Sequence, residues 1–258
     1  MSLKCFDLTG KTALVTGGSQ SIGKAIAKAL LQSGAKVCIT ARTQSKLEKA
    51  AAELCAYGEC IWAAADICNE DQIRAACDLV VNRWGSLDIL VGNAAHGGYF
   101  KEPEDMTMAE WNEVIQQNVN GMFLCAREAA RIMIPQGGGK IVLVASIVTR
   151  VFSPNNAPGA YETSKGGVEV LIRSLAASWA KHNIHVNGIS PGYTLSDIVK
   201  ENYAHMEPGA YEKACALVPM KRFAEVDEMA PMVVALASDA ASYMQGSIIT
   251  IDGGRTLY

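Results

Sequence analysis

The sequence has no apolar run approaching the roughly 18 residues that a membrane-spanning helix requires. Its first ten residues, MSLKCFDLTG, lack the long apolar segment of a secretory signal. Basic residues are fewer than acidic ones, 23 against 26, which gives a formal net charge of −3 and argues against a basic nucleic-acid surface. We therefore expect a cytoplasmic protein with neither nucleic acid nor a membrane as a partner.

The eight cysteines include no Cys-x-x-Cys pair, and the four histidines do not cluster with cysteines or carboxylates at ligand spacing. A disulfide framework would require a much higher cysteine density in a shorter chain. We therefore predict buried, reduced thiols and no metal site.

Half of the 258 residues are hydrophobic, so the chain can bury a full-sized core. Short apolar runs alternate with segments that repeat apolar residues at helical spacing. The first such segment places Ile22, Ala25, Ile26, Ala29 and Leu30 on one helix face. Strands that are apolar throughout, alternating with helices, predict an α/β fold in which a doubly wound parallel sheet is covered on both faces.

We expect about seven strands, at 12–16, 36–40, 60–64, 89–91, 141–145, 185–189 and 247–251. After the first helix, we expect further helices at 45–57, 71–84, 109–133, 161–181 and 227–238. No linker, repeat or change in composition divides the chain, so residues 1–258 are predicted to form a single domain. The long irregular stretch 191–226 is interpreted as a substrate lid, with a packed surface helix as the alternative.

A glycine-rich turn, Thr16-Gly17-Gly18-Ser19-Gln20-Ser21-Ile22-Gly23, connects the first predicted strand to the first helix. Such a turn lets the backbone approach a pyrophosphate, whose charge the helix N-terminus stabilises. Its spacing is not Gly-x-Gly-x-x-Gly, so the prediction depends on its position between a buried strand and an amphipathic helix. The residues assigned to the dinucleotide are Gly17, Ser19, Gln20, Ser21, Ile22 and Gly23.

The end of the second predicted strand indicates which dinucleotide is used. A carboxylate there would hold the ribose 2′-hydroxyl, whereas an arginine accommodates a 2′-phosphate. The chain has Arg42 at this point and no acid before Glu48, which favours NADP(H) over NAD(H). The alternative is that Arg42 only caps the sheet edge, and Gln20 stands where a second cation would strengthen a phosphate site.

Together these motifs resemble the short-chain dehydrogenase/reductase family, from about residue 7 to the C-terminus. The glycine-rich turn is similar to the family's Thr-Gly-x-x-x-Gly-x-Gly, with Ser21 in place of the middle glycine. The resemblance implies a single-domain Rossmann-like fold that binds a nicotinamide dinucleotide. The further cofactor contacts that it implies are Asp66, Ile67, Asn93, Ala94, Pro191, Gly192 and Ser196, together with Tyr161 and Lys165.

The resemblance also implies a complete catalytic set of Asn118, Ser146, Tyr161 and Lys165, with the last two in the family's Tyr-x-x-x-Lys. Four residues apart on a helix, Tyr161 and Lys165 share one face, and a nearby ammonium lowers the pKa of a phenol. Tyr161 would be the general acid in reduction and the general base in oxidation. Ser146 would bond the substrate oxygen, Lys165 would also hold the nicotinamide ribose, and Asn118 would help hold a water.

Ser146 and Tyr161 stand 15 residues apart, two more than is usual in the family. A similar lengthening occurs in the branch that acts on sugars and polyols. We expect the substrate pocket to include His96, Asn155 and Tyr193. Asn155 would bond hydroxyls of a sugar-like chain, or would only shape an exposed turn.

The predicted activity is the NADP(H)-dependent interconversion of a ketone and a secondary alcohol, with a polyol, a keto-sugar or a keto-acid as the substrate. The alternatives are a reductase of acyl-chain (3-oxoacyl) or small cyclic ketones, and a non-catalytic nucleotide-binding regulator.

Members of the family are commonly tetramers that pair two long helices. The predicted helices 109–133 and 161–181 carry apolar positions on more than one face, which suits either self-association or core packing. We therefore expect a homotetramer whose other partner is a small carbonyl or alcohol.

Overall fold

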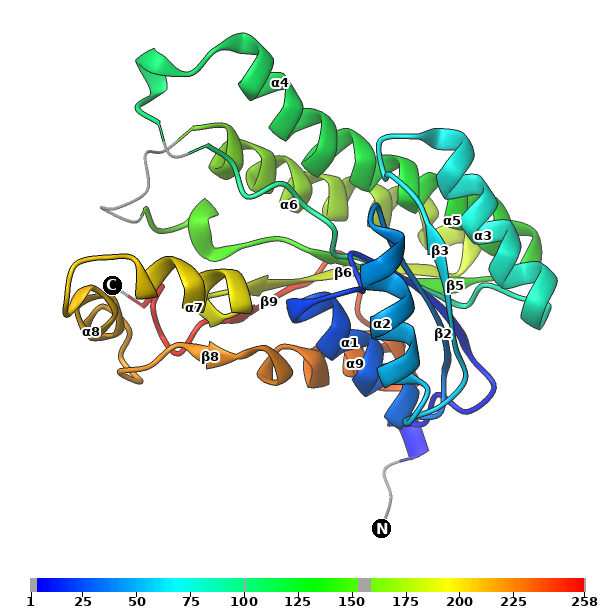
Figure 1. Ribbon diagram of the computed structural model, residues 1–258. Coiled ribbons are helices and arrows are strands. Elements are labelled where there is room, and N and C mark those ends of the chain that lie inside the picture. The colour runs from blue at the N-terminus through cyan, green and yellow to red at the C-terminus, as the bar shows by residue number, and fades with distance from the viewer. Residues whose placement is uncertain (1–3, 100, 153–158, 258) are drawn as a thin grey trace.

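The computed structural model describes residues 4–99, 101–152 and 159–257. Within these ranges, seven strands form one parallel sheet in the order β3-β2-β1-β4-β5-β6-β9 (Figure 1). The strands are β1 (Thr12–Thr16), β2 (Lys36–Ala41), β3 (Cys60–Ala64), β4 (Ile89–Gly92), β5 (Gly139–Val144), β6 (Ile184–Pro191) and β9 (Ile248–Ile251). The α/β fold and the strands expected from the apolar runs are confirmed.

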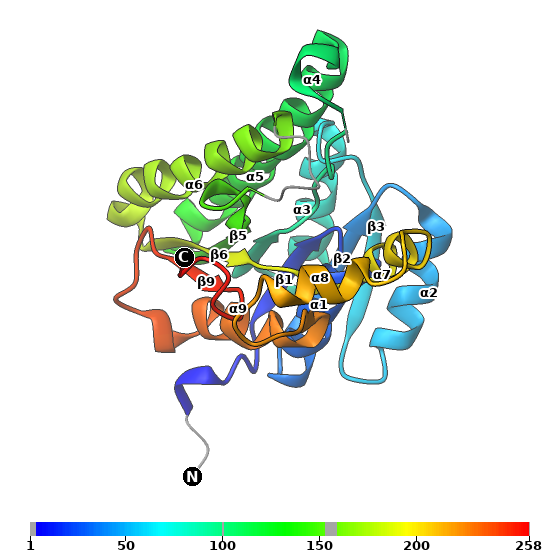
Figure 2. The ribbon, with the colours of Figure 1, turned by 90° about the vertical axis from the view of Figure 1, so that its left-hand side faces the viewer.

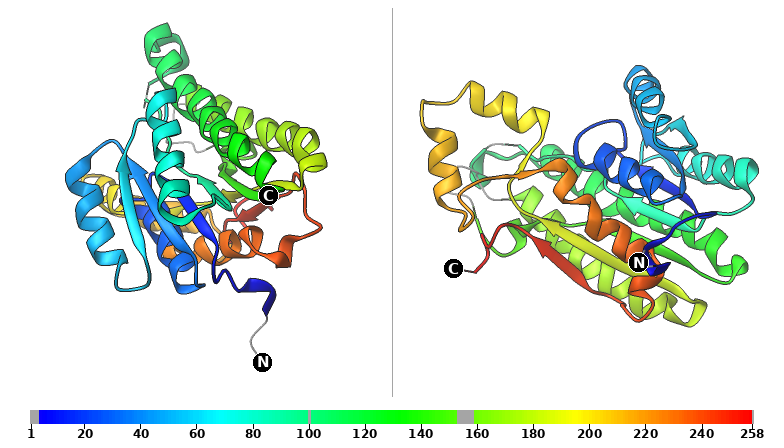
Figure 3. Two further views of the ribbon diagram at one scale, coloured as in Figure 1. Left: turned by 90° about the vertical axis from the view of Figure 1, so that its right-hand side faces the viewer. Right: turned by 90° about the horizontal axis from the view of Figure 1, so that it is seen from below.

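Helices cover both faces of the sheet (Figures 2 and 3). One face carries α1 (Ser21–Gln32), α2 (Gln44–Leu54) and α9 (Ala230–Ala237), and the other carries α3 (Glu70–Trp84), α5 (Met122–Gln136) and α6 (Ala160–Trp179). Side chains alternate along a strand, so β1 sends Ala13 and Val15 into the first hydrophobic core and Leu14 into the second. Burial on both faces explains why the strands are apolar throughout.

The chain reverses its direction of winding between β1 and β4. From β1 it moves outward to β2 and β3, then returns to place β4 against the other side of β1. Neighbouring strands that lead away in opposite directions leave a crevice at their carboxyl ends, where α/β proteins bind ligands. Most of the residues predicted to form the site stand at this edge of the sheet.

The helix expected over 109–133 is interrupted. It consists of α4 (Met108–Ile115), a π-helical segment (Gln116–Gly121) and α5. A capping box between Thr107 and Glu110 starts α4. Wider π-helical turns shift the side chains that follow, and such segments are frequent at functional sites. Asn118 lies within this one.

The stretch 191–226 contains regular elements, so the expectation of an irregular stretch was wrong, while its role as a substrate lid stays a prediction. It contains α7 (Asp197–Ala204), α8 (Ala210–Ala216) and two short parallel strands, β7 (Thr194–Leu195) and β8 (Ala224–Glu225). Its core is aromatic: Phe223 is buried, and its ring lies 4.9 to 5.6 Å from those of Tyr193, Tyr203 and Tyr211. Both helices span about two turns, which is too short for a helical period to stand out in the sequence.

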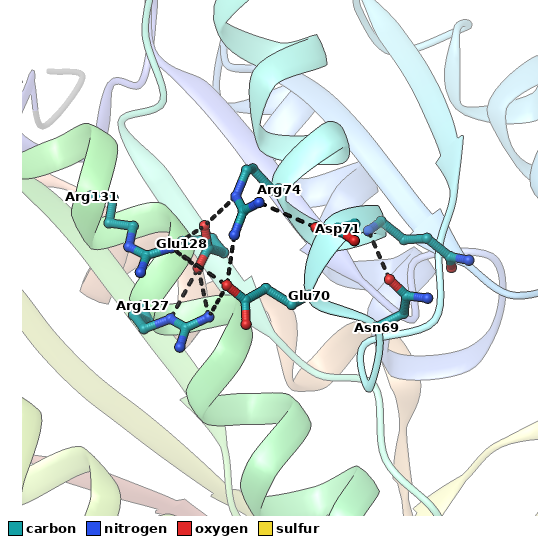
Figure 4. A network of polar contacts seen from close by, with 8 residues as sticks. Asn69, Glu70, Asp71, Arg74, Arg127, Glu128 and Arg131 are labelled. Atoms are coloured by element: carbon teal, nitrogen blue, oxygen red, sulfur yellow. Dashed lines mark hydrogen bonds and ion pairs between the residues drawn. The ribbon is translucent and has the colours of Figure 1, made fainter.

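A polar network joins α3 to α5 (Figure 4). The side chain of Glu128 is only 3% exposed and contacts Arg131 at 2.7 Å, Arg127 at 3.0 Å and Arg74 at 3.3 Å. Burial alone would raise the pKa of Glu128, but Arg131 and Arg127 outweigh it and hold that pKa below its ordinary value. The buried carboxylate is therefore ionised and depends on its arginines.

All eight cysteines lie within the described ranges and are free thiols, but only Cys38, Cys60, Cys77, Cys125 and Cys215 are buried. The expectation of buried thiols was therefore wrong for Cys5 and Cys55, which are exposed, and for Cys68, which is partly exposed. No helix in the described residues is long and apolar enough to cross a membrane.

Candidate active site

Two cavities lie along the carboxyl edge of the sheet. The first, of about 360 Å³, is lined by the glycine-rich turn, the end of β2 and the segment after β3. The second, of about 730 Å³, is lined by the end of β5, the start of α6 and the segment 191–223. Both are bordered by Ser21, Ile22, Asn93 and Ala95, so they form one crevice across the switch point.

The glycine-rich turn is fixed by close backbone packing. A β-carbon on Gly23 would lie 2.2 Å from the carbonyl oxygen of Gly17, and Gly17 itself has φ +67°. The Asn93 amide donates to the carbonyl oxygen of Thr16 at 3.0 Å, while the Thr16 hydroxyl accepts from the backbone N–H groups of Asn93 and Ala94. These contacts tie the end of β1 to the end of β4 and keep side chains out of the space beside the turn. The arrangement fits a dinucleotide pyrophosphate.

Ser21 occupies the middle-glycine position and has φ +51°, in the left-handed region. A side chain in that region costs roughly 1–2 kcal/mol. The residue begins α1 and borders both cavities. Strain of this kind persists where the surrounding structure holds the residue in place.

The first cavity gathers the residues assigned to the adenosine half. Arg42, Asp66 and Ile67 line it together with Ser19 and Gln20. Sequence reasoning missed Lys46, one turn into α2, whose ammonium donates to the Gln20 side-chain oxygen at 3.3 Å. It also missed other lining residues, namely Thr40, Ala41, Thr43, Ala65, Ala95 and Gln117. The sequence offered no signal for Lys46, because its approach to Gln20 depends on how α2 packs beside the turn.

Tyr161 and Lys165 project from the first turns of α6 into the second cavity, where they meet Ser146. The Lys165 ammonium lies 5.8 Å from the centre of the Tyr161 ring and donates to the carbonyl oxygen of Val144 at 2.8 Å. Lys165 is 2% exposed, and this burial lowers its pKa to about 8. The shared helix face places the pair as predicted.

The expected lowering of the Tyr161 pKa is not observed. Burial raises the pKa of its phenol above the ordinary value of 10.0, and a hydrogen bond with Ser146 works in the opposite direction without reversing the shift. Lys165 lies over the ring and is bonded to a carbonyl, so its charge does not offset the desolvation of the hydroxyl. The phenol is therefore protonated at neutral pH.

Asn118 is fully buried, and its side chain positions other residues. The amide oxygen accepts from the backbone N–H of His96 at 2.6 Å, and the amide nitrogen donates to the His96 carbonyl oxygen and to Ser164, each at 2.9 Å. Ser164 in turn donates to the carbonyl oxygen of Tyr161 at 2.7 Å. Both amide hydrogens are used within the protein, so a water held by this residue would have to donate its hydrogen bond to an Asn118 oxygen.

The remaining predicted residues are only partly brought together. Pro191, Gly192, Tyr193 and Ser196 line the second cavity. The Ser196 hydroxyl also accepts from the backbone N–H of residue 199 and so caps α7.

Of the predicted substrate residues, His96 is described but is not among the residues that line that cavity. The ring of His96 accepts from the N–H of Gly98 and lies 3.9 Å from Glu113. The bonds to Asn118 hold its backbone, and its substrate contact stays a prediction. Asn155 lies outside the described residues.

Most of the second cavity is apolar. Away from Ser146 and Tyr161, its walls are formed by Val148, Tyr193, Val199, Tyr203, Met206 and Phe223. Thr194, Ser196, Asn202 and His205, all in the segment 191–226, also line the cavity and carry polar side chains. Among the described residues that line the cavity, Lys165 is the only amine or guanidinium.

Comparison with known proteins shows relatives along nearly the whole chain. A family model described as enoyl-(acyl carrier protein) reductase matches residues 17–256. Gluconate 5-dehydrogenase of Gluconobacter oxydans is 33% identical, over 98% of this chain and 97% of its own. D-Threitol dehydrogenase of Mycolicibacterium smegmatis is 35% identical, over 98% of this chain and 95% of its own.

Solved structures also match nearly the whole chain. A short-chain type dehydrogenase/reductase from Mycobacterium marinum superposes with a TM-score of 0.94 at 35% identity, covering 99% of both chains. A gluconate 5-dehydrogenase from Burkholderia cenocepacia in complex with NADP and tartrate superposes with a TM-score of 0.91 at 30% identity, covering 100% of both chains. A 7α-hydroxysteroid dehydrogenase complexed with NADH also has a TM-score of 0.91 at 30% identity, covering 98% of this chain and 97% of its own.

The crevice at the switch point, the Tyr161–Lys165 pair and this full-length similarity lead to one assignment. The chain belongs to the short-chain dehydrogenase/reductase family and is an NAD(P)-dependent oxidoreductase acting on alcohol and ketone groups.

Proposed function

We propose that the protein is an NADP(H)-dependent oxidoreductase that interconverts a ketone and a secondary alcohol, with a polyol or keto-sugar as the substrate. The observation that carries the cofactor choice is Arg42 at the end of β2, in a cavity that faces the glycine-rich turn. Among the described residues, Asp66 is the one carboxylate that lines that cavity, and it follows β3 and not β2. An anion at the tip of β2 would repel a 2′-phosphate, whereas a guanidinium attracts it.

The catalytic role of each residue follows from its contacts. A bound nicotinamide supplies or accepts the hydride. Tyr161, protonated at neutral pH, donates its proton to the substrate oxygen during reduction and recovers it during oxidation. The Ser146 hydroxyl bonds the same oxygen as negative charge develops there.

Other residues orient these groups. Lys165, anchored on Val144, faces the phenol and is placed to bond the nicotinamide ribose. Asn118 acts as a positioning residue, because its bond to Ser164 fixes the first turn of α6. Pro191, Gly192 and Ser196 would line the nicotinamide side of the crevice.

A polyol substrate is supported by the name of one relative, D-threitol dehydrogenase, whereas that of gluconate 5-dehydrogenase supports a sugar acid. In the segment 191–226, the cavity-lining side chains that could bond hydroxyl groups are those of Tyr193, Thr194, Ser196, Asn202, Tyr203 and His205. A keto-acid is less well matched, since Lys165 is the only lysine or arginine among the described lining residues and its ammonium is bonded to Val144.

The apolar wall favours a second candidate. A cavity of about 730 Å³ with three aromatic rings, those of Tyr193, Tyr203 and Phe223, suits an uncharged ketone with a bulky apolar body. Cyclic ketones and 3-oxoacyl groups have this chemistry.

The test is a reductase assay with NADPH and a panel of keto-sugars, keto-acids, cyclic ketones and 3-oxoacyl thioesters. We expect turnover of at least one class and a loss of at least about 100-fold in Tyr161→Phe. Tyr243→Phe, which alters a fully exposed ring, should leave turnover unchanged. Near-wild-type turnover by Tyr161→Phe would exclude Tyr161 as the proton donor.

We also propose a homotetramer assembled through α5 and α6. Phe123 on α5 is 38% exposed and Val170 on α6 is 63% exposed, which leaves apolar side chains on the outward faces of both helices. Light scattering of the wild type should give a molar mass four times that of the chain. Val170→Glu should lower this measured mass. A wild-type monomer at micromolar concentration would refute the assembly.

A further inference from the structure

The nucleotide cavity contains a second cation that the linear sequence does not reveal. Gln20 occupies the place in the glycine-rich turn where a cation would complement Arg42. In the folded protein, the Lys46 ammonium reaches this residue from α2 and donates to its side-chain oxygen at 3.3 Å. Lys46, Arg42, Thr43 and Gln20 line the same cavity.

Neither cation has an ion-pair partner among the described residues, although the carboxylate of Asp66 lines the same cavity. Among the ion pairs of the described residues, none involves Arg42 or Lys46, although Lys24, Lys28 and Lys36 nearby each have a carboxylate partner. The closest acid in sequence, Glu48, accepts a hydrogen bond from Gln44 at 2.8 Å. Two positions apart on a helix, Lys46 and Glu48 do not face each other.

The two cations that line the cavity have different neighbours. Arg42 lies close enough to Cys68, after β3, to oppose the burial that raises the pKa of that thiol to about 11. Lys46 lies beside Gln20, on the side of the glycine-rich turn. Between them, Thr43 precedes α2 without a side-chain capping bond, so its hydroxyl is available to a ligand.

We propose that Lys46, positioned by Gln20, is the second cation of a 2′-phosphate site and that it sets the preference for NADP(H) together with Arg42. The inference rests on the proposed function, because it specifies how that cofactor is recognised. A phosphate bound here contacts a guanidinium, an ammonium and a hydroxyl. Lys46 thus supplies from α2 the charge that Gln20 cannot supply from the turn.

The experiment measures binding and does not require turnover. NADPH and NADH are titrated by fluorescence, and 2′,5′-ADP and 5′-AMP by calorimetry, against the wild type, Lys46→Ala and Lys49→Ala. Lys49 is the matched control, since it is exposed on the same helix and does not line the cavity. We expect Lys46→Ala to weaken the binding of NADPH and of 2′,5′-ADP about five- to tenfold. The affinities for NADH and 5′-AMP should stay unchanged within about twofold. Lys49→Ala should bind all four ligands like the wild type.

A rescue experiment tests the geometry. Gln20→Lys in the Lys46→Ala background places an amine on the turn at the point that Lys46 reaches, so we expect it to restore most of the lost NADPH affinity. Failure of this rescue would contradict the proposed position of the phosphate.

The possible failures are distinguishable. A wild type that binds NADPH no better than NADH would refute the NADP(H) assignment itself. A wild type that prefers NADPH, with a Lys46→Ala variant that keeps both affinities or loses both equally, would overturn only the role of Lys46.

Discussion

The ammonium of Lys165 donates a hydrogen bond to the carbonyl oxygen of Val144 at 2.8 Å, and Val144 ends β5 two positions before Ser146. This bond joins the helix that carries Tyr161 and Lys165 to the strand that carries Ser146. The catalytic side chains are therefore held by one connected piece of structure. The energetic cost is that an amine is buried with a single protein hydrogen bond, which lowers its pKa to about 8.

The buried lysine should make stability depend on pH. From about pH 8 to 10.5, the unfolded chain keeps a proton that folded Lys165 has released, so the free energy of unfolding rises with pH. Tyr161, whose pKa is raised above 10.0, opposes this rise only beyond pH 10. Buried thiols such as Cys38 and Cys77, whose pKa is raised from 9.0, also lower the free energy of unfolding above about pH 9. The Lys165 contribution should therefore appear in urea denaturation between pH 7 and pH 10 as the difference between the wild type and Lys165→Met.

Lys165→Met should lack this contribution, so the free energy of unfolding of the wild type should rise relative to that of the variant from about pH 8 to pH 10. The variant should also be more stable than the wild type at pH 7 by about 2 kcal/mol, because the desolvation cost exceeds the value of one hydrogen bond. Lys181→Met, at an exposed lysine, is the control and should keep the wild-type pH dependence. Identical slopes in Lys165→Met and the wild type would contradict the assignment of this titration to Lys165.

Ser146 should tune the acidity of Tyr161 as well as bind substrate. Its hydrogen bond lowers the phenol pKa, so Ser146→Ala should move the alkaline transition in the pH profile of alcohol oxidation to higher pH. The rate constant kcat should fall by about 100-fold, since one donor to the developing oxyanion is lost. Ser146→Thr, which keeps a hydroxyl, should retain the position of the transition. An unshifted profile in the alanine variant would show that the hydrogen bond has no effect on the phenol.

Ser21→Gly should stabilise the protein. Glycine adopts the left-handed backbone of this position, φ +51°, without steric cost, and this gain exceeds its larger loss of chain entropy on folding. We expect an increase of about 0.5–1 kcal/mol, or about 2 °C in Tm. Ser19→Gly is the matched control, because Ser19 is not among the described residues with positive φ and should gain nothing. A lower Tm for Ser21→Gly would mean that the serine hydroxyl stabilises the turn by more than the strain costs.

Glu128→Gln should destabilise the junction of α3 and α5. The substitution removes the buried charge that Arg127 and Arg131 contact and should cost about 2 kcal/mol, below the value for a fully buried pair because Arg131 is 54% exposed. Since the pKa of Glu128 is lowered, this stabilisation is present above the ordinary value of 4.5 and is lost as the pH falls below it. The control is Asp71→Asn, which removes a 90% exposed partner of Arg74 and should cost less than about 0.5 kcal/mol. Equal effects of the two substitutions in chemical denaturation would argue against the buried charge as the cause.

The amino-acid sequence by itself determined the order of strands and helices, because burial on two faces requires uninterrupted apolar strands and amphipathic helices. It also determined the glycine-rich turn and the shared helix face of Tyr161 and Lys165. These features are local: each depends on residues that are close together in the chain, where periodicity and steric freedom decide the outcome.

Only the tertiary structure decided how these parts act on one another. Lys46 meets Gln20 across 26 residues, and Asn118 reaches Ser164 across 46, through the packing of separate elements. The direction of the Tyr161 pKa shift likewise depends on how much water the surrounding protein excludes from the phenol and on where the Lys165 ammonium is held. Such effects fall steeply with distance and with exposure to solvent, so they are fixed by coordinates in space and not by spacing along the chain.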